Sequence, residues 1–261
     1  MKLYVMYNGT DDGMPKELVA STGSPVDFDD CMSIPSTTFL IDHPEKGYIL
    51  FDTGWTVKGK VGFNLSPEEN IVNTLAKIGV TPEEINYLIV SHLHIDHAGN
   101  ITPFVNAEFI VSENEFINVA SLYMQNNLPG RAYVPEDIES WTKGKFNWHL
   151  IKEQYELIDF AEGIKLIPLG EGHAFGLIAL LVELPEYGNV ILSSDAIYAA
   201  VNVGPPLVPP GVTLNIDGWY KSMEYLLEVA EEYDAKIWYG HDIDQLATLT
   251  IATSKDEGYY E

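Results

Sequence analysis

SHLHIDHAGN, residues 91–100, carries three imidazoles and a carboxylate within six positions: His92, His94, Asp96 and His97. The apolar run Tyr87–Val90 precedes it and is typical of a strand, so these side chains emerge at a sheet edge, where ligand sites form. His92 and His94 point to one side of an extended chain because side chains alternate, whereas Asp96 and His97 follow the turn and can face a second ion. Imidazole and carboxylate suit Zn²⁺ and neighbouring divalent metals, and four such groups buried without partners would be costly. The stretch therefore predicts a metal site.

Two ions need more ligands than these four, and three further positions qualify. Each lies just past an apolar run, on the sheet edge that the first cluster is expected to occupy: His173, Asp195 and His241. Taken alone, each of the three would more often be structural than ligating. His43, which precedes Pro44 in a predicted hairpin, and His149, in or beside an irregular segment, are predicted not to ligate.

Short apolar runs recur along the chain and predict strands, because each is bounded by Gly, Pro, Asn or Asp. They are Lys2–Tyr7, Thr37–Asp42, Tyr48–Asp52, Tyr87–Val90, Phe109–Val111, Ile164–Ile167, Leu177–Leu184 and Val190–Leu192. The strands come first as a meander and then alternate with helical segments. This order favours an α/β fold in which two sheets pack together with helices outside.

Three segments are predicted to be helical. In the first, Ser66 can cap the helix, Glu69 completes a capping box, and Gly79 ends it. Ser112 and Glu115 repeat the capping-box spacing before a second helix. The third lies near Gly218–Tyr233, and its apolar stripe is predicted to face the core: Tyr220, Met223, Leu227 and Ala230.

The segment Asn126–Lys145 is less regular and contains two prolines and two glycines. A loop of this length inside a compact domain is usually functional or mobile. It carries Tyr133 and Trp141, so it is interpreted either as a surface insertion with its own small cluster or as a lid over a pocket.

Composition excludes several classes of function. Lys and Arg number 14 against 39 Asp and Glu, a formal net charge of −25, which disfavours binding to nucleic acid and to anionic membranes. Arg131 is the only arginine, which argues for a neutral or weakly charged substrate. Cys31 is the only cysteine and is predicted to be a buried apolar residue, and its isolation fits a cytoplasmic protein. No signal peptide and no membrane-spanning run is predicted.

The pattern resembles the metallo-β-lactamase superfamily over nearly the whole chain. The resemblance rests on Phe51-Asp52-Thr53-Gly54, the run His92–His97, a later Gly-His, a strand ending in Asp195, and a C-terminal Gly-His. Within the superfamily the chain looks most like the N-acyl-homoserine lactonases and the related pyridoxolactonases. Asp195 is followed three residues later by Tyr198, and the last motif is Gly240-His241-Asp242, as in that branch.

The resemblance implies a single domain over residues 1–261 with the αβ/βα four-layer sandwich of the metallo-β-lactamase fold, and an insertion or lid near 118–150. It implies two divalent metal ions, with zinc expected first and iron, manganese or cobalt as alternatives. One ion would be held by His92, His94 and His173, the other by Asp96, His97 and His241, and Asp195 would bridge them together with a hydroxide. Asp52 would orient a ligating imidazole.

The implied activity is a quorum-quenching lactonase, which opens a small-molecule lactone ring by attack of the metal-bridging hydroxide. Tyr198 would donate a hydrogen bond to the oxyanion or the ring oxygen, and Asp96 would pass a proton to the leaving alkoxide. Other hydrolases on the same scaffold, acting on pyridoxolactone, a thioester or a phosphodiester, stay open, as does a non-catalytic binding protein.

The sequence departs from the family at two motifs. Asn100 stands where a second glycine is common, and Leu177 follows Gly172-His173-Ala174-Phe175-Gly176 where a second histidine is often found. The first, ligating histidine is kept, so these departures concern the substrate more than the metals.

Overall fold

The computed structural model describes residues 1–21, 31–55, 66–129 and 132–261, so Arg131 and the side chain of Cys31 lie outside the described part. The strands are β1 (Lys2–Pro15), β2 (Cys31–His43), β3 (Gly47–Phe51), β4 (Ile85–Ile89), β5 (Glu108–Ser112), β6 (Asn147–Ile151), β7 (Ile158–Ala161), β8 (Ile164–Leu169), β9 (Leu177–Leu184), β10 (Gly188–Leu192), β11 (Lys236–Trp238) and β12 (Tyr259–Tyr260). The α-helices are α1 (Lys16–Val19), α2 (Ile71–Lys77), α3 (Ile95–Ala98), α4 (Glu113–Met124), α5 (Pro135–Lys143), α6 (Ala200–Val203), α7 (Ile216–Glu232) and α8 (Ile243–Leu246).

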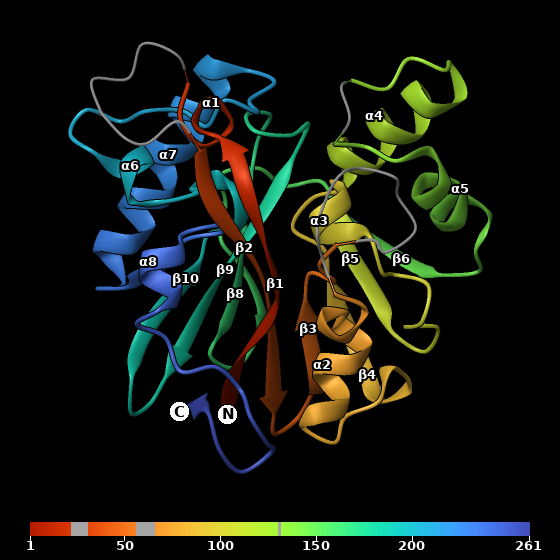
Figure 1. Ribbon diagram of the computed structural model, residues 1–261, viewed down its shortest axis with the longest axis vertical. Coiled ribbons are helices and arrows are strands. Elements are labelled where there is room, and N and C mark those ends of the chain that lie inside the picture. The colour runs from red at the N-terminus through yellow and green to blue at the C-terminus, as the bar shows by residue number, and fades with distance from the viewer. Residues whose placement is uncertain (22–30, 56–65, 130–131) are drawn as a thin grey trace. The chain divides into compact units, whose positions relative to one another are not determined.

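The chain forms two compact units and two sheets. Unit 1 consists of Met1–Gly9, Ser36–Lys152 and Leu249–Glu261, and unit 2 consists of Thr10–Pro35 and Glu153–Thr248. One sheet has the strand order β12-β1-β2-β3-β4-β5-β6, and the other has the order β11-β10-β9-β8-β7. Figure 1 labels β1 to β6 of the first sheet and β8 to β10 of the second. The predicted α/β class with two sheets and helices is confirmed.

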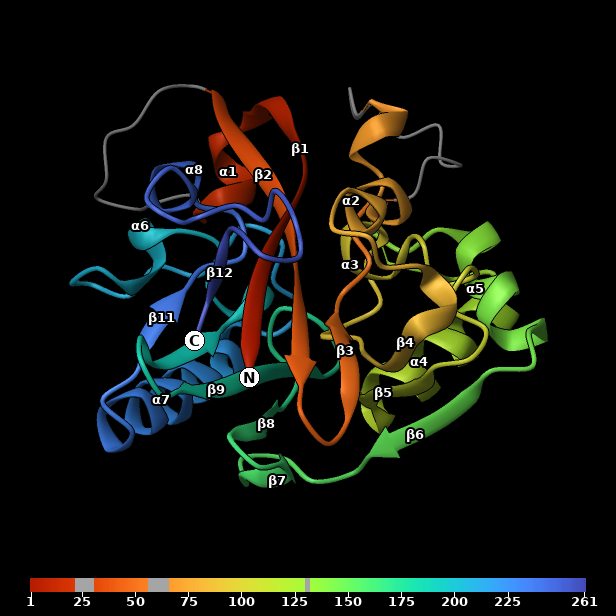
Figure 2. The same cartoon turned by 90° about the horizontal axis from the view of Figure 1, so that it is seen from below.

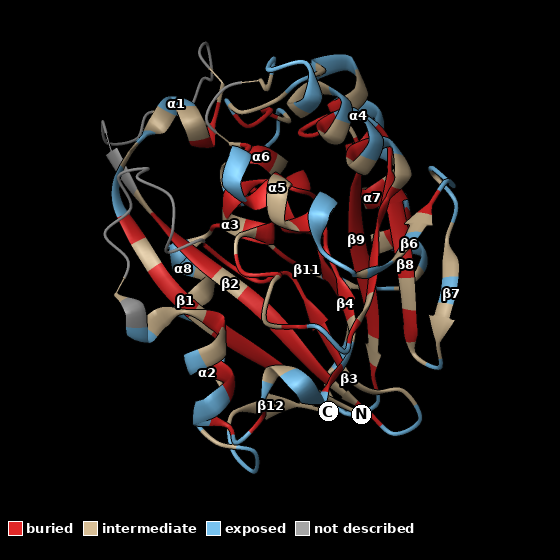
Figure 3. Cartoon of the chain, turned by 90° about the vertical axis from the view of Figure 1, so that its right-hand side faces the viewer, coloured by how far each residue is buried: buried red, intermediate tan, exposed pale blue. Residues whose placement is uncertain are grey.

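In unit 1, strand β4 lies between β3 and β5 and is parallel to both. Leu88 and Ile89 are fully buried, and β4 is coloured as buried over much of its length in Figure 3. The chain therefore leaves the carboxyl end of a central parallel strand at Ser91, as the sequence predicts for a ligand site. The β2–β3 hairpin carries His43, whose Nδ1 accepts hydrogen bonds from the backbone N–H groups of Glu45 and Lys46 at 3.2 and 3.1 Å.

The first predicted helix begins later than expected. Helix α2 starts at Ile71, and its N-cap is Asn70, whose side chain accepts a hydrogen bond from Val72 N–H at 2.9 Å. Residues Pro67–Glu69 form a separate 3₁₀ turn, in which the Glu69 carboxylate accepts from Ser66 N–H. Glu69 therefore reaches back to Ser66 as predicted, and Ser66 Oγ accepts from Glu68 N–H at 3.3 Å, but they cap this turn; the expectation that Ser66 caps α2 itself was wrong, because Asn70 does so. Gly79 follows the helix with a φ of 74°, as predicted for its end.

The second helix, α4, begins after Ser112, but the predicted capping box is absent. The Ser112 side chain makes no capping hydrogen bond, and Glu115 is fully buried and turns to the segment that carries the histidines. The irregular segment also departs from expectation, because α5 occupies Pro135–Lys143 with Pro135 in its first turn.

Unit 2 is built on an antiparallel core, with β9 between β8 and β10, and every residue of β9 except Glu183 is buried. Helix α7 packs on this sheet through Trp219, Met223, Leu226 and Val229. The predicted stripe was partly wrong: Met223 is buried, but Tyr220 is 42 % exposed and Trp219 takes the central place.

Strand β11 corresponds to the apolar run predicted before His241, whereas β6, β7 and β12 were not predicted. Strand β12 pairs antiparallel with β1, so that Leu3 faces Tyr260 and the two ends of the chain lie together (Figure 2). Among the described residues, none of the helices is long and apolar enough to span a bilayer.

Candidate metal centre

The segment after β4 brings the first two histidines together within unit 1. His92 Nε2 and His94 Nδ1 lie 2.9 Å apart, and both side chains are almost fully buried. The Ser91 hydroxyl lies 3.0 Å from His92 Nδ1. Extended backbone puts positions 92 and 94 on one side, as predicted, so their ring nitrogens converge on one point.

The single turn of helix α3 then changes the direction of the chain and carries Asp96 and His97. Asp52, in a left-handed conformation with a φ of 64°, accepts hydrogen bonds from Ser91 N–H and Ser91 Oγ, both at 2.7 Å, and from His97 Nδ1 at 2.8 Å. Because a carboxylate can only accept, the proton of neutral His97 is on Nδ1. His97 Nε2 is then an acceptor, and it faces Asp96 Oδ2 at 3.5 Å.

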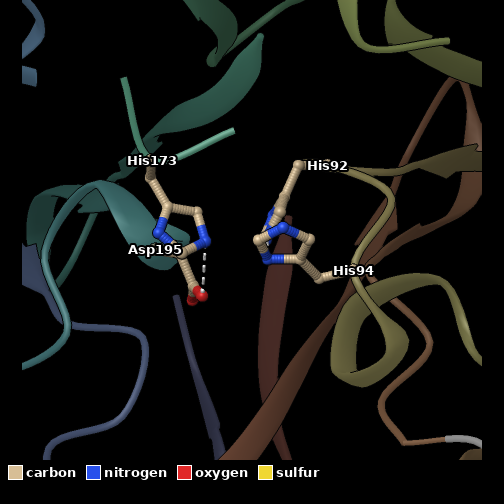
Figure 4. Close-up of side chains that lie close together, drawn as sticks. All are labelled: His92, His94, His173 and Asp195. Atoms are coloured by element: carbon tan, nitrogen blue, oxygen red, sulfur yellow. Dashed lines mark hydrogen bonds and ion pairs between the residues drawn. The ribbon is translucent and has the colours of Figure 1, made fainter. Parts of the chain in front are cut away.

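In unit 2 the register of two parallel strands aligns a second pair. Leu192 of β10 pairs with Trp238 of β11, and Asp195 and His241 each follow three residues later. His241 Nε2 lies 3.0 Å from Asp195 Oδ1, and His173 Nε2 lies 3.2 Å from Asp195 Oδ2. Figure 4 draws the contact between His173 and Asp195 as a dashed line.

The tautomers of these histidines are fixed by backbone carbonyls. His173 Nδ1 donates to Val212 O at 2.6 Å, and His241 Nδ1 donates to Pro35 O at 2.8 Å, since a carbonyl has no proton to give. In the neutral imidazoles, Nε2 is therefore a lone-pair atom, and each points at one oxygen of the Asp195 carboxylate.

Acceptors that face acceptors in a buried place need either a proton or a metal cation between them. Asp195 is fully buried, and His173 and His241 are nearly so, so water supplies little screening. The same arrangement occurs at His97 and Asp96 in unit 1. Imidazole nitrogens and carboxylate oxygens are the donor set of zinc and similar divalent ions, so the residues present fit such a group.

Two backbone features hold Asp195 in place. Ser194 has a φ of 47°, and Gly240 passes so close that a Cβ there would meet Ser194 O at 2.8 Å and Asp195 Oδ1 at 2.9 Å. A residue with a side chain at 240 would displace the carboxylate, so glycine is required for steric reasons.

Tyr198 lies beside this cluster. Its ring centroid is 4.8 Å from that of His241 and 5.5 Å from that of His173, and the side chain is buried. Its carbonyl also accepts a hydrogen bond from His241 N–H at 2.8 Å. The predicted spacing of three residues therefore brings Tyr198 against two of the candidate ligands.

Two residues near His94, Glu115 and Tyr133, were not predicted from the sequence to belong to the site. The Tyr133 hydroxyl donates to Glu115 Oε1 at 2.9 Å, and the Tyr133 ring stands edge-on to His94, with centroids 4.6 Å apart. Burial and the neighbouring Glu115 carboxylate raise the pKa of Tyr133 well above its usual value, so the hydroxyl stays a donor. Glu115 matched a capping pattern, and no local signal reveals its partner in the chain 22 residues earlier.

Taken together, the described residues contain two groups of His and Asp side chains that can hold a metal ion. The first is His92, His94, His173 and Asp195, and the second is Asp96, His97, Asp195 and His241. All seven predicted positions belong to these groups, and neither His43 nor exposed His149 does.

Comparison with known proteins assigns the family. The model of the metallo-beta-lactamase superfamily matches residues 34–241. A curated N-acyl homoserine lactonase, AiiB of Agrobacterium fabrum, is 30% identical over 243 residues, which cover 88% of this chain and 86% of AiiB. The N-acyl homoserine lactonase of Bacillus thuringiensis is 29% identical over 82% of this chain and 84% of its own length.

Solved structures agree. A mutant of B. thuringiensis AiiA with N-decanoyl-L-homoserine bound at the active site superposes with a TM-score of 0.79 at 26% identity, covering 100% of this chain and 98% of that one. A lactone hydrolase with its product N-hexanoyl-L-homoserine bound at the catalytic metal center gives the same score, identity and coverage.

Fold and donor set define the class, a metal-dependent hydrolase of the metallo-β-lactamase fold, as the motifs indicated. The chain belongs to the metallo-β-lactamase superfamily, in the branch of the N-acyl-homoserine lactonases.

Proposed function

We propose that the chain is a dinuclear lactonase that opens N-acyl-homoserine lactones or lactones of similar size and charge. The observation that carries the proposal is the placement of two imidazole lone pairs against the two oxygens of buried Asp195. Relatives named as N-acyl homoserine lactonases support the substrate class.

The proposed ligand sets follow the two groups of side chains. One ion would be held by His92, His94 and His173 and the other by Asp96, His97 and His241, while Asp195, which belongs to both groups, would serve both ions. Zinc is the proposed metal because imidazole and carboxylate are its common ligands in proteins. Bound there, two divalent ions would supply a water activated at neutral pH and an electrophile for the carbonyl oxygen.

The chain's own groups have separate roles. Asp52 keeps His97 in the Nδ1–H tautomer, and the carbonyls of Val212 and Pro35 do the same for His173 and His241. Asp96, whose side chain is 12% exposed, passes the proton lost by the attacking water to the leaving alkoxide. The Tyr198 hydroxyl donates to the oxyanion that develops as the ring opens.

Three further points remain predictions. A single functional domain over residues 1–261, a lid near 118–150 and a cytoplasmic location follow from the sequence interpretation. The scarcity of arginine favours a substrate with little charge.

A hydrolysis panel on metal-loaded protein tests the proposal. It contains short- and long-chain homoserine lactones, simple γ- and δ-lactones, pyridoxolactone, a thioester and a phosphodiester, read by acid release, while elemental analysis counts the ions. We expect two ions per chain and fastest turnover on a homoserine lactone. Fewer than two ions under metal-replete conditions, or turnover confined to the thioester or phosphodiester, would refute it.

A further inference from the structure

We propose that Glu115 and Tyr133 are positioning residues that hold the segment His92-Leu93-His94 in the geometry that binds a metal ion. The proposal rests on the ligand assignment made above, and it gives helix α4 and the residues just before α5 a part in the metal site. All of its contacts lie within unit 1.

Three consecutive residues, Leu93, His94 and Ile95, contact the start of α4 or the residues before α5. Leu93 N–H donates to Glu115 Oε1 at 3.0 Å, and Ile95 N–H donates to Ala132 O at 2.8 Å. Between them, the His94 ring meets the edge of the Tyr133 ring at an interplanar angle of 72°. The start of α4 and the residues before α5 therefore fix the two backbone positions that flank His94. They also supply the aromatic ring against which the His94 ring packs.

A hydrogen bond to the Leu93 amide has the largest influence on the directions of the ligand side chains. It lies between the two imidazoles of one predicted ligand set, so a rotation of this peptide changes the direction of both. The Tyr133 hydroxyl donates to the same oxygen that receives Leu93 N–H, which keeps Glu115 Oε1 directed at the segment.

Burial shows that this arrangement is built and not incidental. Glu115 is fully buried and Tyr133 is 3% exposed. A carboxylate loses much solvation free energy when it is buried, and charge-assisted hydrogen bonds recover part of it. The third residue of α4 would ordinarily stabilise the helix start, yet here its carboxylate serves another segment.

A purely structural role predicts a different outcome from a positioning role. Structural residues affect the free energy of unfolding and leave the metal affinity of the folded protein unchanged. Positioning residues affect metal affinity and ligand geometry in variants that remain folded.

The experiment compares three variants of the whole chain with matched controls. Glu115→Leu removes the acceptor, Glu115→Gln keeps an oxygen acceptor without the charge, and Tyr133→Phe removes one hydroxyl and keeps the ring. Glu113→Gln and Tyr123→Phe are the controls, because both lie on α4 and, among the described residues, neither makes a hydrogen bond or ion pair with His92-Leu93-His94; Glu113 pairs with Lys152. The probes are Zn²⁺, measured by chelator competition, and Co²⁺, measured by its visible absorption spectrum.

We expect Glu115→Leu to weaken the binding of one ion by about 10- to 100-fold, the range found for groups that orient metal ligands. Tyr133→Phe should weaken it by about tenfold or less and shift the Co²⁺ bands. Glu115→Gln should keep most of the affinity, because its carbonyl oxygen can accept both hydrogen bonds. The two controls should match the wild type.

Two results would overturn the proposal: wild-type metal affinity and spectra in Tyr133→Phe and Glu115→Leu, or a Gln variant as weak as the Leu variant. If Glu115→Leu does not fold, Tyr133→Phe alone decides, since it retains the ring packing. If the wild type binds metal but opens no lactone, the proposed function is refuted. The metal affinities of the variants then still decide whether Glu115 and Tyr133 are positioning residues.

Discussion

Two imidazole nitrogens lie against the carboxylate of Asp195, and a carboxylate has no proton to donate to them. Asn in its place would present an NH₂ group that can donate to one Nε2, so we expect Asp195→Asn to lose bound metal while its metal-free form unfolds no earlier than the metal-free wild type. Elemental analysis and thermal unfolding with and without chelator measure both. His149→Ala, which changes an exposed residue outside the candidate groups, should keep full metal content. Equal metal loss in the two variants would contradict the ligand assignment.

Tyr198 offers a second test on a single side chain. Tyr198→Phe keeps the ring between His173 and His241, so metal content should not change. Loss of one oxyanion donor should lower kcat by roughly ten- to a thousand-fold, toward the lower end because other groups share the charge. Steady-state kinetics on the best lactone measures it. An unchanged kcat would remove Tyr198 from the mechanism.

How far single residues could be predicted depends on where their partners lie. The metal-ligand pattern can be recognised in the sequence where its members are neighbours in the chain, as are His92, His94, Asp96 and His97. Glu115 could not be recognised, since its partners are brought to it by folding and its spacing from Ser112 matched a capping box that does not form.

The start of helix α2 gives a prediction about an element. Asn70→Ala removes the side-chain acceptor for Val72 N–H and should lower the free energy of unfolding by about 1 kcal/mol. Ser66→Ala should cost clearly less, because Ser66 lies in the separate turn before the helix. Urea unfolding followed by circular dichroism compares the two. A larger loss of unfolding free energy for Ser66→Ala than for Asn70→Ala would show that Ser66 caps the helix.

Elements with strong patterns were predictable and weak ones were not. The eight predicted strands all occur, since each combines apolar residues with clear boundaries. Strand β12 has two residues, too few to show a pattern. Strand β6 does alternate, with Asn147 and His149 exposed and Trp148 and Leu150 less so, but it is short and follows directly on the irregular segment, so it was missed. Helix α5 was obscured by Pro129, Gly130 and Pro135, although proline is well tolerated in the first turn of a helix.

Tyr4 links the first strand to the last segment of unit 1 and gives a prediction for the stability of the molecule. Its hydroxyl donates to Lys255 O at 2.9 Å, and burial, with Asp42 next, raises its pKa from 10.0 to about 12. The unfolded chain loses this proton near pH 10 and the folded one near 12, so the stabilisation is complete below pH 10 and is lost as pH rises toward 12.

Tyr4→Phe should therefore be less stable than the wild type at pH 8, and the difference should shrink between pH 10 and 12. Denaturant unfolding at a series of pH values measures it. A difference that stays constant across this range would show that Tyr4 has the same pKa in both states.

Unit 1 takes strands from both ends of the chain, and this has a consequence for its synthesis on a ribosome. Strand β1 ends at Pro15, but its outer neighbour β12 begins at Tyr259, so it is translated 259 − 15 = 244 residues later. At roughly 5–20 residues per second, the β1 edge waits on the order of ten seconds or longer with unpaired amides. Exposed strand edges recruit other strands. A nascent-chain chaperone that covers β1 thus has a defined interval in which to act. This interval ends when β12 has left the exit tunnel and can pair with β1.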